Sequence, residues 1–210
     1  MEQVAKQIAE KLLQIKAIKL EPANHFIWAS GWFSPIYCDN RKTLSFPEVR
    51  TFIKDSFVNL IKEKFGDFDV VAGVATGAIA QGALVAEALN KPFVYVRSKA
   101  KEHGMGNQIE GYLEQGKKVL VVEDLISTGG SSLSAVKAIR ENNCEVVGMV
   151  AIFTYGFQKA VDSFKDSDVK LVTLSNYDAL IEHAISTGYV SESDLELLKE
   201  WRLNPSIWKK

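Results

Sequence analysis

Hydrophobic positions in the first seventeen residues repeat at helical spacing, which predicts an amphipathic helix. The apolar members of this repeat are Val4, Ile8, Leu12 and Ile15. Residues 25–41 are instead aromatic and contain Ser-Gly and Ser-Pro pairs, so they predict short strands and loops. Ser45 and Glu48 have the spacing of a capping box and predict the start of a second helix, which Gly66 ends.

From residue 70 onward, apolar β-rich runs alternate with helical stretches. Strands are predicted at 70–74, 93–97, 118–123, 146–153 and 170–174. Helices are predicted near 78–89, 131–142, 156–164, 177–186 and 191–202, the last capped by Ser191 and Asp194. Continuous Val/Ile/Leu strands that alternate with helices are typical of a parallel sheet covered on both faces. The sequence therefore predicts an α/β fold with a central, mostly parallel sheet flanked by helices.

We expect one domain in three parts. A small N-terminal hood of helix and strands spans residues ~1–45, the α/β core spans ~46–175, and C-terminal helices span ~176–210. The run 70–86 carries no charged residue, but its glycines and its Ala/Val composition favour a buried strand, a turn and a helix over a membrane span. We expect no membrane association.

Composition narrows the functional classes. The chain has 210 residues and a formal net charge of −1, so it lacks the basic excess of a general nucleic-acid binder. Cys38 and Cys144 form no CxxC motif, which makes a zinc site or a disulfide scaffold unexpected. Glu2 and Glu10 interrupt the N-terminal apolar pattern, unlike a signal peptide. These features favour a reducing, cytoplasmic location.

The most informative stretch is KVLVVEDLISTGGSS at 118–132. A predicted strand ends at the adjacent acids Glu123 and Asp124, and a loop of small and hydroxyl residues then leads into a helix. Such a turn presents backbone N–H groups and the positive end of the helix dipole to a phosphate. The acids can accept hydrogen bonds from sugar hydroxyls or organise a cation that travels with the ligand. The string predicts a ribose-5-phosphate site; the alternative is an ordinary strand–turn–helix with a surface acid pair.

The string VVEDLISTGGS closely resembles the phosphoribosyl-diphosphate signature of type I phosphoribosyltransferases. Three further stretches make the chain similar to the orotate phosphoribosyltransferase family: SGWFSPIYCDNR at 30–41, GVATGAIA at 73–80 and VRSKAKEHGMGNQIEG at 96–111. The resemblance implies the type I phosphoribosyltransferase fold. It also implies a pentosyltransferase that moves the 5-phosphoribosyl group from 5-phospho-α-D-ribose 1-diphosphate to orotate. Orotidine 5′-phosphate and diphosphate would be the products, in pyrimidine (UMP) biosynthesis, with Mg²⁺ bound mainly through the phosphoribosyl diphosphate.

The resemblance also implies roles for individual residues. Contacts to the phosphoribosyl diphosphate are implied for Thr76, Gly77, Arg97, Lys99, Lys101, His103, Glu123, Asp124, Leu125, Ile126, Ser127, Thr128, Gly129, Gly130 and Ser131. Within this set, catalytic roles fall to Lys101, His103, Glu123 and Asp124, while Ser127 also contacts orotate. The alternative for the glycine in 73–80 is tight strand–helix packing alone.

The segment 98–111 is implied to be a mobile flap. Its glycines permit closure over a ligand, and the alternating basic residues from Arg97 to His103 project to one side if the segment is extended. In this family the flap often completes the site of the neighbouring subunit, so we expect a homodimer. The alternative is a solvated basic loop.

Recognition of orotate is where the chain departs from the pattern. Some family members carry a lysine and an arginine that meet the base or its carboxylate, at the places held here by Ala29 and Tyr155. Arg41, at the end of the aromatic stretch, is our candidate for the missing cation. A further lysine of some members is Ser98 here, and we transfer its role to Lys99. Two roles are open for the aromatic residues Trp28, Trp32, Phe33 and Tyr37. They form flat walls around a base, or they make core or dimer contacts.

Three functions remain open on the sequence. The first is the orotate enzyme. The second is a phosphoribosyltransferase for a purine or another base, against which the stretch at 30–41 argues. The third is a non-catalytic regulator that senses phosphoribosyl diphosphate, which would need a nucleic-acid-binding module or a strongly basic face.

Overall fold

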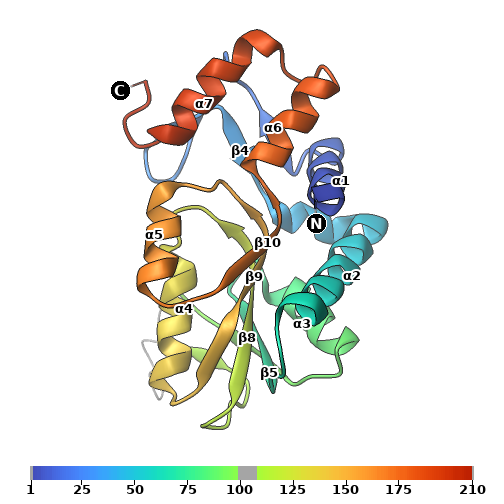
Figure 1. Cartoon of the computed structure of the whole chain (residues 1–210), viewed down its shortest axis with the longest axis vertical. Coiled ribbons are helices and arrows are strands. Elements are labelled where there is room, and N and C mark those ends of the chain that lie inside the picture. Colours follow the sequence, from blue (N-terminus) through green and yellow to red (C-terminus); the bar gives the residue numbers. More distant parts are fainter. Residues whose placement is uncertain (1, 99–107, 210) are drawn as a thin grey trace.

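A central sheet organises the computed structural model, which describes residues 2–98 and 108–209. Within these residues the sheet has six strands in the order β10-β9-β8-β5-β6-β7 (Figure 1). The strands are β5 (Val70–Val74), β6 (Phe93–Val96), β7 (Ile109–Glu110), β8 (Lys118–Ile126), β9 (Glu145–Thr154) and β10 (Leu171–Asn176). Neighbours run parallel except β7, which pairs antiparallel with β6. The prediction of a mostly parallel α/β sheet is confirmed.

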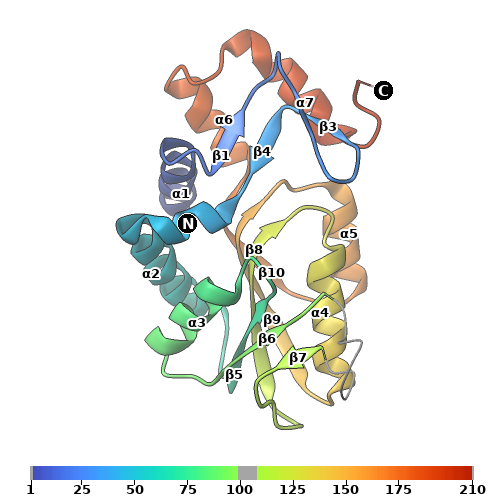
Figure 2. The ribbon, with the colours of Figure 1, turned by 180° about the vertical axis from the view of Figure 1, so that it is seen from behind.

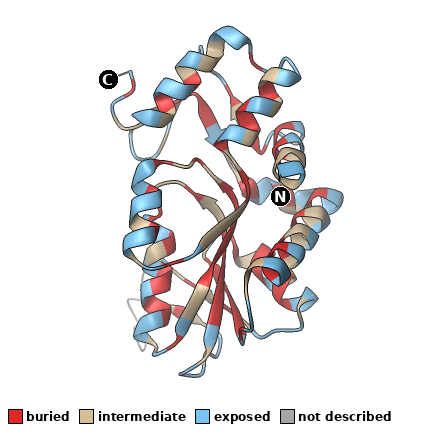
Figure 3. Cartoon of the chain, viewed as in Figure 1, coloured by how far each residue is buried: buried red, intermediate tan, exposed pale blue. Residues whose placement is uncertain are grey.

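Helices cover both faces of this sheet. On one face lie α2 (Pro47–Lys64) and α3 (Ile79–Ala88), and on the other lie α4 (Gly130–Glu141) and α5 (Gln158–Asp166) (Figures 1 and 2). Side chains of β5 alternate between the two faces as strand geometry requires. Val71 packs into the hydrophobic cluster with α2 and α3, whereas Val70 and Ala72 belong to the cluster with α4 and α5. Burial on both faces explains why the strands read as continuous apolar runs (Figure 3).

The N-terminal hood combines α1 (Glu2–Gln14) with short antiparallel strands. These are β1 (Ile18–Leu20) paired with β4 (Ile36–Cys38), and β2 (Phe26–Ile27) paired with β3 (Phe33–Ser34). A 3₁₀ helix, η1 (Asn40–Ser45), then leads towards α2. The predicted amphipathic helix is therefore present, and the aromatic stretch forms the short strands and loops that the sequence indicates.

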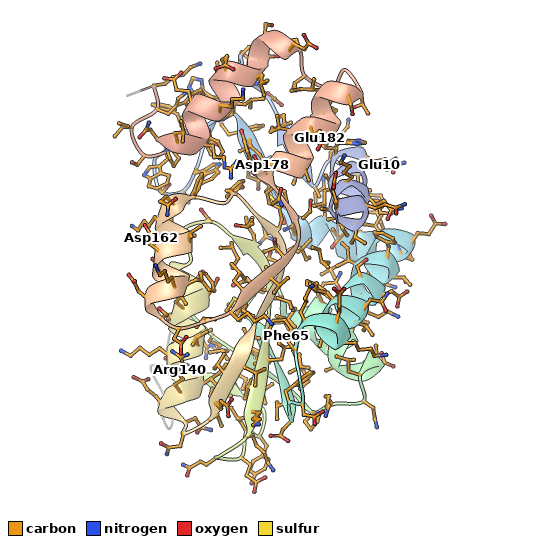
Figure 4. The ribbon with its side chains drawn as sticks, viewed as in Figure 1. Glu10, Phe65, Arg140, Asp162, Asp178 and Glu182 are labelled. Atoms are coloured by element: carbon orange, nitrogen blue, oxygen red, sulfur yellow. The ribbon has the colours of Figure 1, made fainter. Side chains whose placement is uncertain are left out.

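C-terminal helices pack against the hood. They are α6 (Tyr177–Ser186) and α7 (Leu195–Leu203), joined through the 3₁₀ turn η2 (Glu192–Asp194). Glu182 on α6 lies beside α1, where its carboxylate accepts a hydrogen bond from Lys6 Nζ at 2.8 Å (Figure 4). Trp201 Nε1 donates to the carbonyl of Phe33 at 3.2 Å and so joins α7 to β3. The N-terminal hood and the C-terminal helices thus pack against each other.

The predicted start of the second helix is wrong by one residue. Ser45 ends η1 and makes no helix cap; α2 begins at Pro47 after Phe46, whose backbone is extended at φ −117° and ψ 96°. Proline suits the first turn of a helix and disfavours helical geometry in the residue before it, so Pro47 decides the boundary. The capping box of Ser191 and Asp194 is present and opens η2, which continues into α7. Among the described residues, no helix is long and apolar enough to cross a lipid bilayer.

Candidate active site

A cavity of about 460 Å³ lies at the carboxyl ends of β5 and β8. Ligands of open α/β sheets bind at this end of the strands. Of the predicted site residues, Thr76, Gly77, Glu123, Asp124, Leu125, Ser127, Thr128, Gly129, Gly130 and Ser131 line this main cavity. The hood adds Cys38, Asp39 and Arg41 to its wall. Ile126 is fully buried, and its side chain belongs to the hydrophobic cluster with α4 and α5.

The signature loop, residues 127–131, turns directly into α4. Gly129 precedes the helix with a left-handed backbone at φ 84°, a conformation that glycine adopts without steric cost. The N–H groups of the first helical turn have no partners within the helix, and the helix dipole adds partial positive charge there. The hydroxyl residues Ser127, Thr128 and Ser131 line the same cavity. This end of the cavity is built to hold an anion such as a phosphate.

The two adjacent acids differ in their surroundings. Glu123 is only 4% exposed; its Oε2 accepts from Ser132 Oγ at 2.8 Å and its Oε1 from the Asp124 N–H at 2.9 Å. Burial, and then the nearby charge of Asp124, raise the pKa of Glu123 well above its usual value. Glu123 therefore keeps its proton to a higher pH than an exposed glutamate, and Asp124 is the more accessible carboxylate of the pair.

The loop after β5 makes the opposite wall. Its Ala75–Thr76 peptide bond is cis, and Gly77 lies directly against the carboxylate of Asp124. A Cβ on Gly77 would overlap that carboxylate, so glycine here makes room for the site. The alternative of tight packing applies to the other glycine of the stretch 73–80, Gly73, where a Cβ would come within 2.8 Å of the Ala78 carbonyl oxygen.

A neighbouring hollow of about 510 Å³ shares Ala75 and Thr76 with the main cavity and also contains Arg97. Arg97 Nη1 lies 3.5 Å from Glu110 Oε1 on β7. The cation therefore stands beside the loop that faces the acids. The other predicted cations, Lys99, Lys101 and His103, lie outside the described residues and stay predictions, as does most of the proposed flap.

An aromatic pocket of about 230 Å³ adjoins the main cavity. Its lining residues are Ile27, Trp28, Ala29, Tyr37, Cys38, Leu125, Ser127 and Tyr155. The rings of Trp28 and Tyr155 lie 5.2 Å apart, and Trp28 Nε1 donates to the carbonyl of Ile36 at 3.0 Å. Burial raises the pKa of Tyr155 well above its usual value, so its hydroxyl stays neutral. Flat, mostly uncharged walls of this kind suit a planar ring.

The aromatic candidates of the sequence divide into two groups. Trp28 and Tyr37 line the aromatic pocket. Trp32 instead stacks on Trp28 with ring centroids 6.4 Å apart. The backbone carbonyl of Phe33 accepts the hydrogen bond from Trp201 on α7. Ala29 and Tyr155, which stand where some family members carry cations, are both on the pocket wall.

Arg41 lines the main cavity rather than the aromatic pocket. Its Nε donates to Asp39 Oδ1 at 2.7 Å, and this hydrogen bond lowers the pKa of Asp39 and raises the pKa of Arg41. Both groups are therefore charged at neutral pH. The guanidinium stays half-exposed and available to an anionic ligand in the cavity.

Comparison with known proteins agrees with this architecture. The phosphoribosyl transferase domain family matches residues 45–184. The orotate phosphoribosyltransferase of Phocaeicola vulgatus is 61% identical over 209 residues, which cover 100% of this chain and 99% of the relative. The chain belongs to the orotate phosphoribosyltransferase family.

Solved structures of the orotate phosphoribosyltransferase family have the same fold. The enzyme from Aeropyrum pernix superposes with a TM-score of 0.76 at 27% identity, covering 88% of this chain and 99% of that chain. The Mycobacterium tuberculosis enzyme, solved in complex with 5-phospho-α-D-ribosyl 1-diphosphate, superposes with a TM-score of 0.66 at 24% identity, covering 84% of this chain and 98% of that chain. Among the alternatives that the sequence left open, family membership selects the orotate enzyme.

Two buried residues that touch the acid pair were not predicted from the sequence. Ser132 holds Glu123, as described above. Asn40, on the hood, donates from Nδ2 to the carbonyl of Asp124 at 2.6 Å across 84 positions of sequence. Ser132 directly follows the signature loop, so its position near Glu123 could have been predicted from the sequence. Asn40 carries no local signal, because its partner is known only once the hood is folded over β8.

Proposed function

We propose that this chain transfers the 5-phosphoribosyl group of 5-phospho-α-D-ribose 1-diphosphate to orotate, forming orotidine 5′-phosphate and releasing diphosphate. One observation carries the proposal: the aromatic pocket adjoins the main cavity and shares three of its lining residues, Cys38, Leu125 and Ser127. A planar base in the pocket would stand beside a sugar in the cavity. The names of the full-length relatives support orotate as the base.

The sugar would be held from two sides. We assign its 5′-phosphate to the N–H groups and hydroxyls of the signature loop, and its ring hydroxyls to Asp124 and Glu123. A ring nitrogen of orotate loses its proton to solvent and forms the new bond to the anomeric carbon while the bond to diphosphate breaks, and positive charge develops on the ribose. The negative charge of Asp124 stabilises that cationic transition state.

The departing diphosphate would gain negative charge as it leaves. We assign it to the backbone of Thr76 and Gly77 and to Arg97, together with Lys99, Lys101 and His103, which the sequence predicts for the same role. Cations and backbone donors already in position lower the barrier, because they need not reorganise during the reaction.

Mg²⁺ would enter with the diphosphate. In the described part of the chain, no three acidic, His or Cys side chains cluster into a metal cage. The carboxyl groups at the main cavity are instead Asp124, Asp39, which is paired with Arg41, and Glu123, which is buried and hydrogen-bonded. This fits an ion that is bound mainly through substrate phosphates. Bound there, Mg²⁺ would neutralise the charge that builds on the leaving group.

The biological setting extends the same proposal. We place the reaction in the cytoplasm, in keeping with the two free thiols Cys38 and Cys144. We also propose a homodimer in which the flap 98–111 serves the neighbouring subunit. Nucleic acid and membranes have no part in this function.

A spectrophotometric assay tests the proposal. The chain is incubated with phosphoribosyl diphosphate, Mg²⁺ and one of four bases: orotate, uracil, hypoxanthine or adenine. Consumption of orotate alone is the expected result. Consumption of a purine would contradict the proposal, and binding of phosphoribosyl diphosphate without consumption of any base would favour a sensor instead.

A further inference from the structure

Transfer between two bound substrates requires their reacting atoms to lie about 3–3.5 Å apart in the correct orientation. In this chain the two binding regions come from separate parts of the fold. The hood supplies most of the aromatic pocket, through residues 27–29, 37 and 38, whereas the loops after β5 and β8 supply most of the main cavity. The position of the hood over β8 therefore determines the distance from base to sugar.

One buried side chain joins these two regions. Asn40 is 2% exposed, and its Nδ2 donates to the carbonyl of Asp124 at 2.6 Å. Its Oδ1 accepts a hydrogen bond from Cys38 Sγ at 3.3 Å. Cys38 lines both the aromatic pocket and the main cavity, and Asp124 lines the main cavity. A single amide thus bonds a wall of the base pocket to the backbone of the acid pair.

The surroundings of Asn40 make this link firm. Its own carbonyl accepts from Thr43 Oγ1 at 2.6 Å, which fixes Asn40 within η1. Burial raises the pKa of the Cys38 thiol well above its usual value, so Cys38 keeps the proton that it donates to Asn40. Water cannot easily replace a lost partner at a site this buried, and a donor left unpaired there is costly.

We propose that Asn40 is a positioning residue for phosphoribosyl transfer: it sets the base-binding hood in register with the sugar-binding end of β8. Asn40 touches neither substrate and acts through Cys38 and Asp124. This inference rests on the proposed function. Each binding region is complete without Asn40, so its loss leaves each substrate a place to bind and changes how the two places are aligned.

The test uses ligands that occupy one region or both. Phosphoribosyl diphosphate occupies the main cavity and the hollow beside Arg97 and needs no part of the aromatic pocket, whereas orotidine 5′-phosphate joins base and sugar covalently and must fit the main cavity and the aromatic pocket at once. In Asn40→Leu, which keeps a similar side-chain volume, adds no charge and removes both hydrogen bonds of the amide, we expect unchanged affinity for phosphoribosyl diphosphate by calorimetry. Affinity for orotidine 5′-phosphate should fall about tenfold, and kcat with orotate about 100-fold.

Ser175→Ala is the matched control, since it removes a buried 2.8 Å hydrogen bond that also joins the sheet to the hood, from Ser175 Oγ to the Ala5 carbonyl, at residues that line neither the main cavity nor the aromatic pocket. This control should lower the melting temperature. The ratio of its affinities for phosphoribosyl diphosphate and orotidine 5′-phosphate should equal that of the wild type. Asn40→Ala provides a second variant should Asn40→Leu fold poorly.

The proposal would be overturned if the Asn40 variants bound both ligands with equally reduced affinity, or bound both with wild-type affinity. Failure of both variants to fold would also overturn it and assign Asn40 a structural role. The assay of the wild type distinguishes a failure of the proposed function from a failure of this inference. If the wild type does not consume orotate, both fail; if it does, only the Asn40 variants decide the inference.

Discussion

The carboxylate of Asp124 occupies the space where any residue other than glycine at position 77 would place its Cβ. A Cβ on Gly77 would lie within 2.6 Å of Asp124 Oδ1 and still closer to Oδ2. Contacts this short do not occur between real atoms, so Gly77 and Asp124 fit only as a pair. The loop after β5 and the acid pair near the carboxyl end of β8 are therefore parts of one site, although 47 positions separate Gly77 from Asp124 in the sequence.

Gly77→Ala should displace the Asp124 carboxylate and reduce activity. We expect kcat/KM for phosphoribosyl diphosphate to fall at least about tenfold, since small misplacements of reacting groups cost large factors in rate. Steady-state kinetics measures this. Gly66→Ala is the control, because a Cβ on the exposed Gly66 meets no atom within 4 Å. Equal kinetics in both variants would contradict the fit described above.

The buried Glu123 should make stability depend on pH. Its pKa in the folded chain is raised by burial and by Asp124, so between its ordinary value of 4.5 and the raised value the unfolded chain is ionised while the folded chain holds the proton. The folded state then binds more protons, and its free energy of unfolding falls as pH rises. Glu123→Gln removes this effect.

Denaturant unfolding of the wild type and of Glu123→Gln at a series of pH values measures this dependence of stability on pH. The variant should gain stability relative to the wild type as pH rises from about 4.5, with the gain levelling off above the raised pKa. A difference between the two proteins that is constant with pH would show that Glu123 ionises normally in the folded chain.

Ser132→Ala should destabilise the fold, because it leaves Oε2 of the buried Glu123 without its 2.8 Å donor. The expected loss is about 1–3 kcal/mol in the free energy of unfolding. Ser131→Ala, at the exposed neighbouring position, should change stability by less than about 0.5 kcal/mol. Chemical denaturation of the two variants distinguishes these outcomes, and equal stabilities would remove the proposed support for Glu123.

Much of the fold was predictable from local patterns. The buried strands of the central sheet show as apolar runs, and the helices between them show as periodic stretches, because each element carries its own signal. The start of α2 was mispredicted because Ser45 and Glu48 have capping-box spacing, while the nearby Pro47 carried the stronger constraint. β7 is too short, at two residues, to have a pattern of its own.

The candidate site was predictable where its residues are contiguous. The signature loop and the acid pair lie together in one string, so their common place at the end of β8 follows from the sequence. The pairing of Gly77 with Asp124, and of Asn40 with the Asp124 carbonyl, joins distant segments. Such contacts depend on strand order and on the packing of the hood, which no local pattern encodes.

Arg41 provides a test of how orotate is recognised. Its guanidinium, paired with Asp39, is a cation on the wall of the main cavity. Arg41→Ala should raise the KM for orotate about 10- to 100-fold, the value of a hydrogen bond to a charged group. Arg50→Ala, which removes a cation bonded to the Leu44 carbonyl outside both cavities, is the control. An unchanged KM for orotate in Arg41→Ala would exclude this role.

A crystal structure with orotidine 5′-phosphate bound tests the central claim most directly. The account predicts the 5′-phosphate on the N–H groups of residues 127–131, the ribose hydroxyls at Asp124, and the base in the aromatic pocket, against the neighbouring rings of Trp28 and Tyr155. A nucleotide bound elsewhere, with the main cavity and the aromatic pocket both empty, would contradict it.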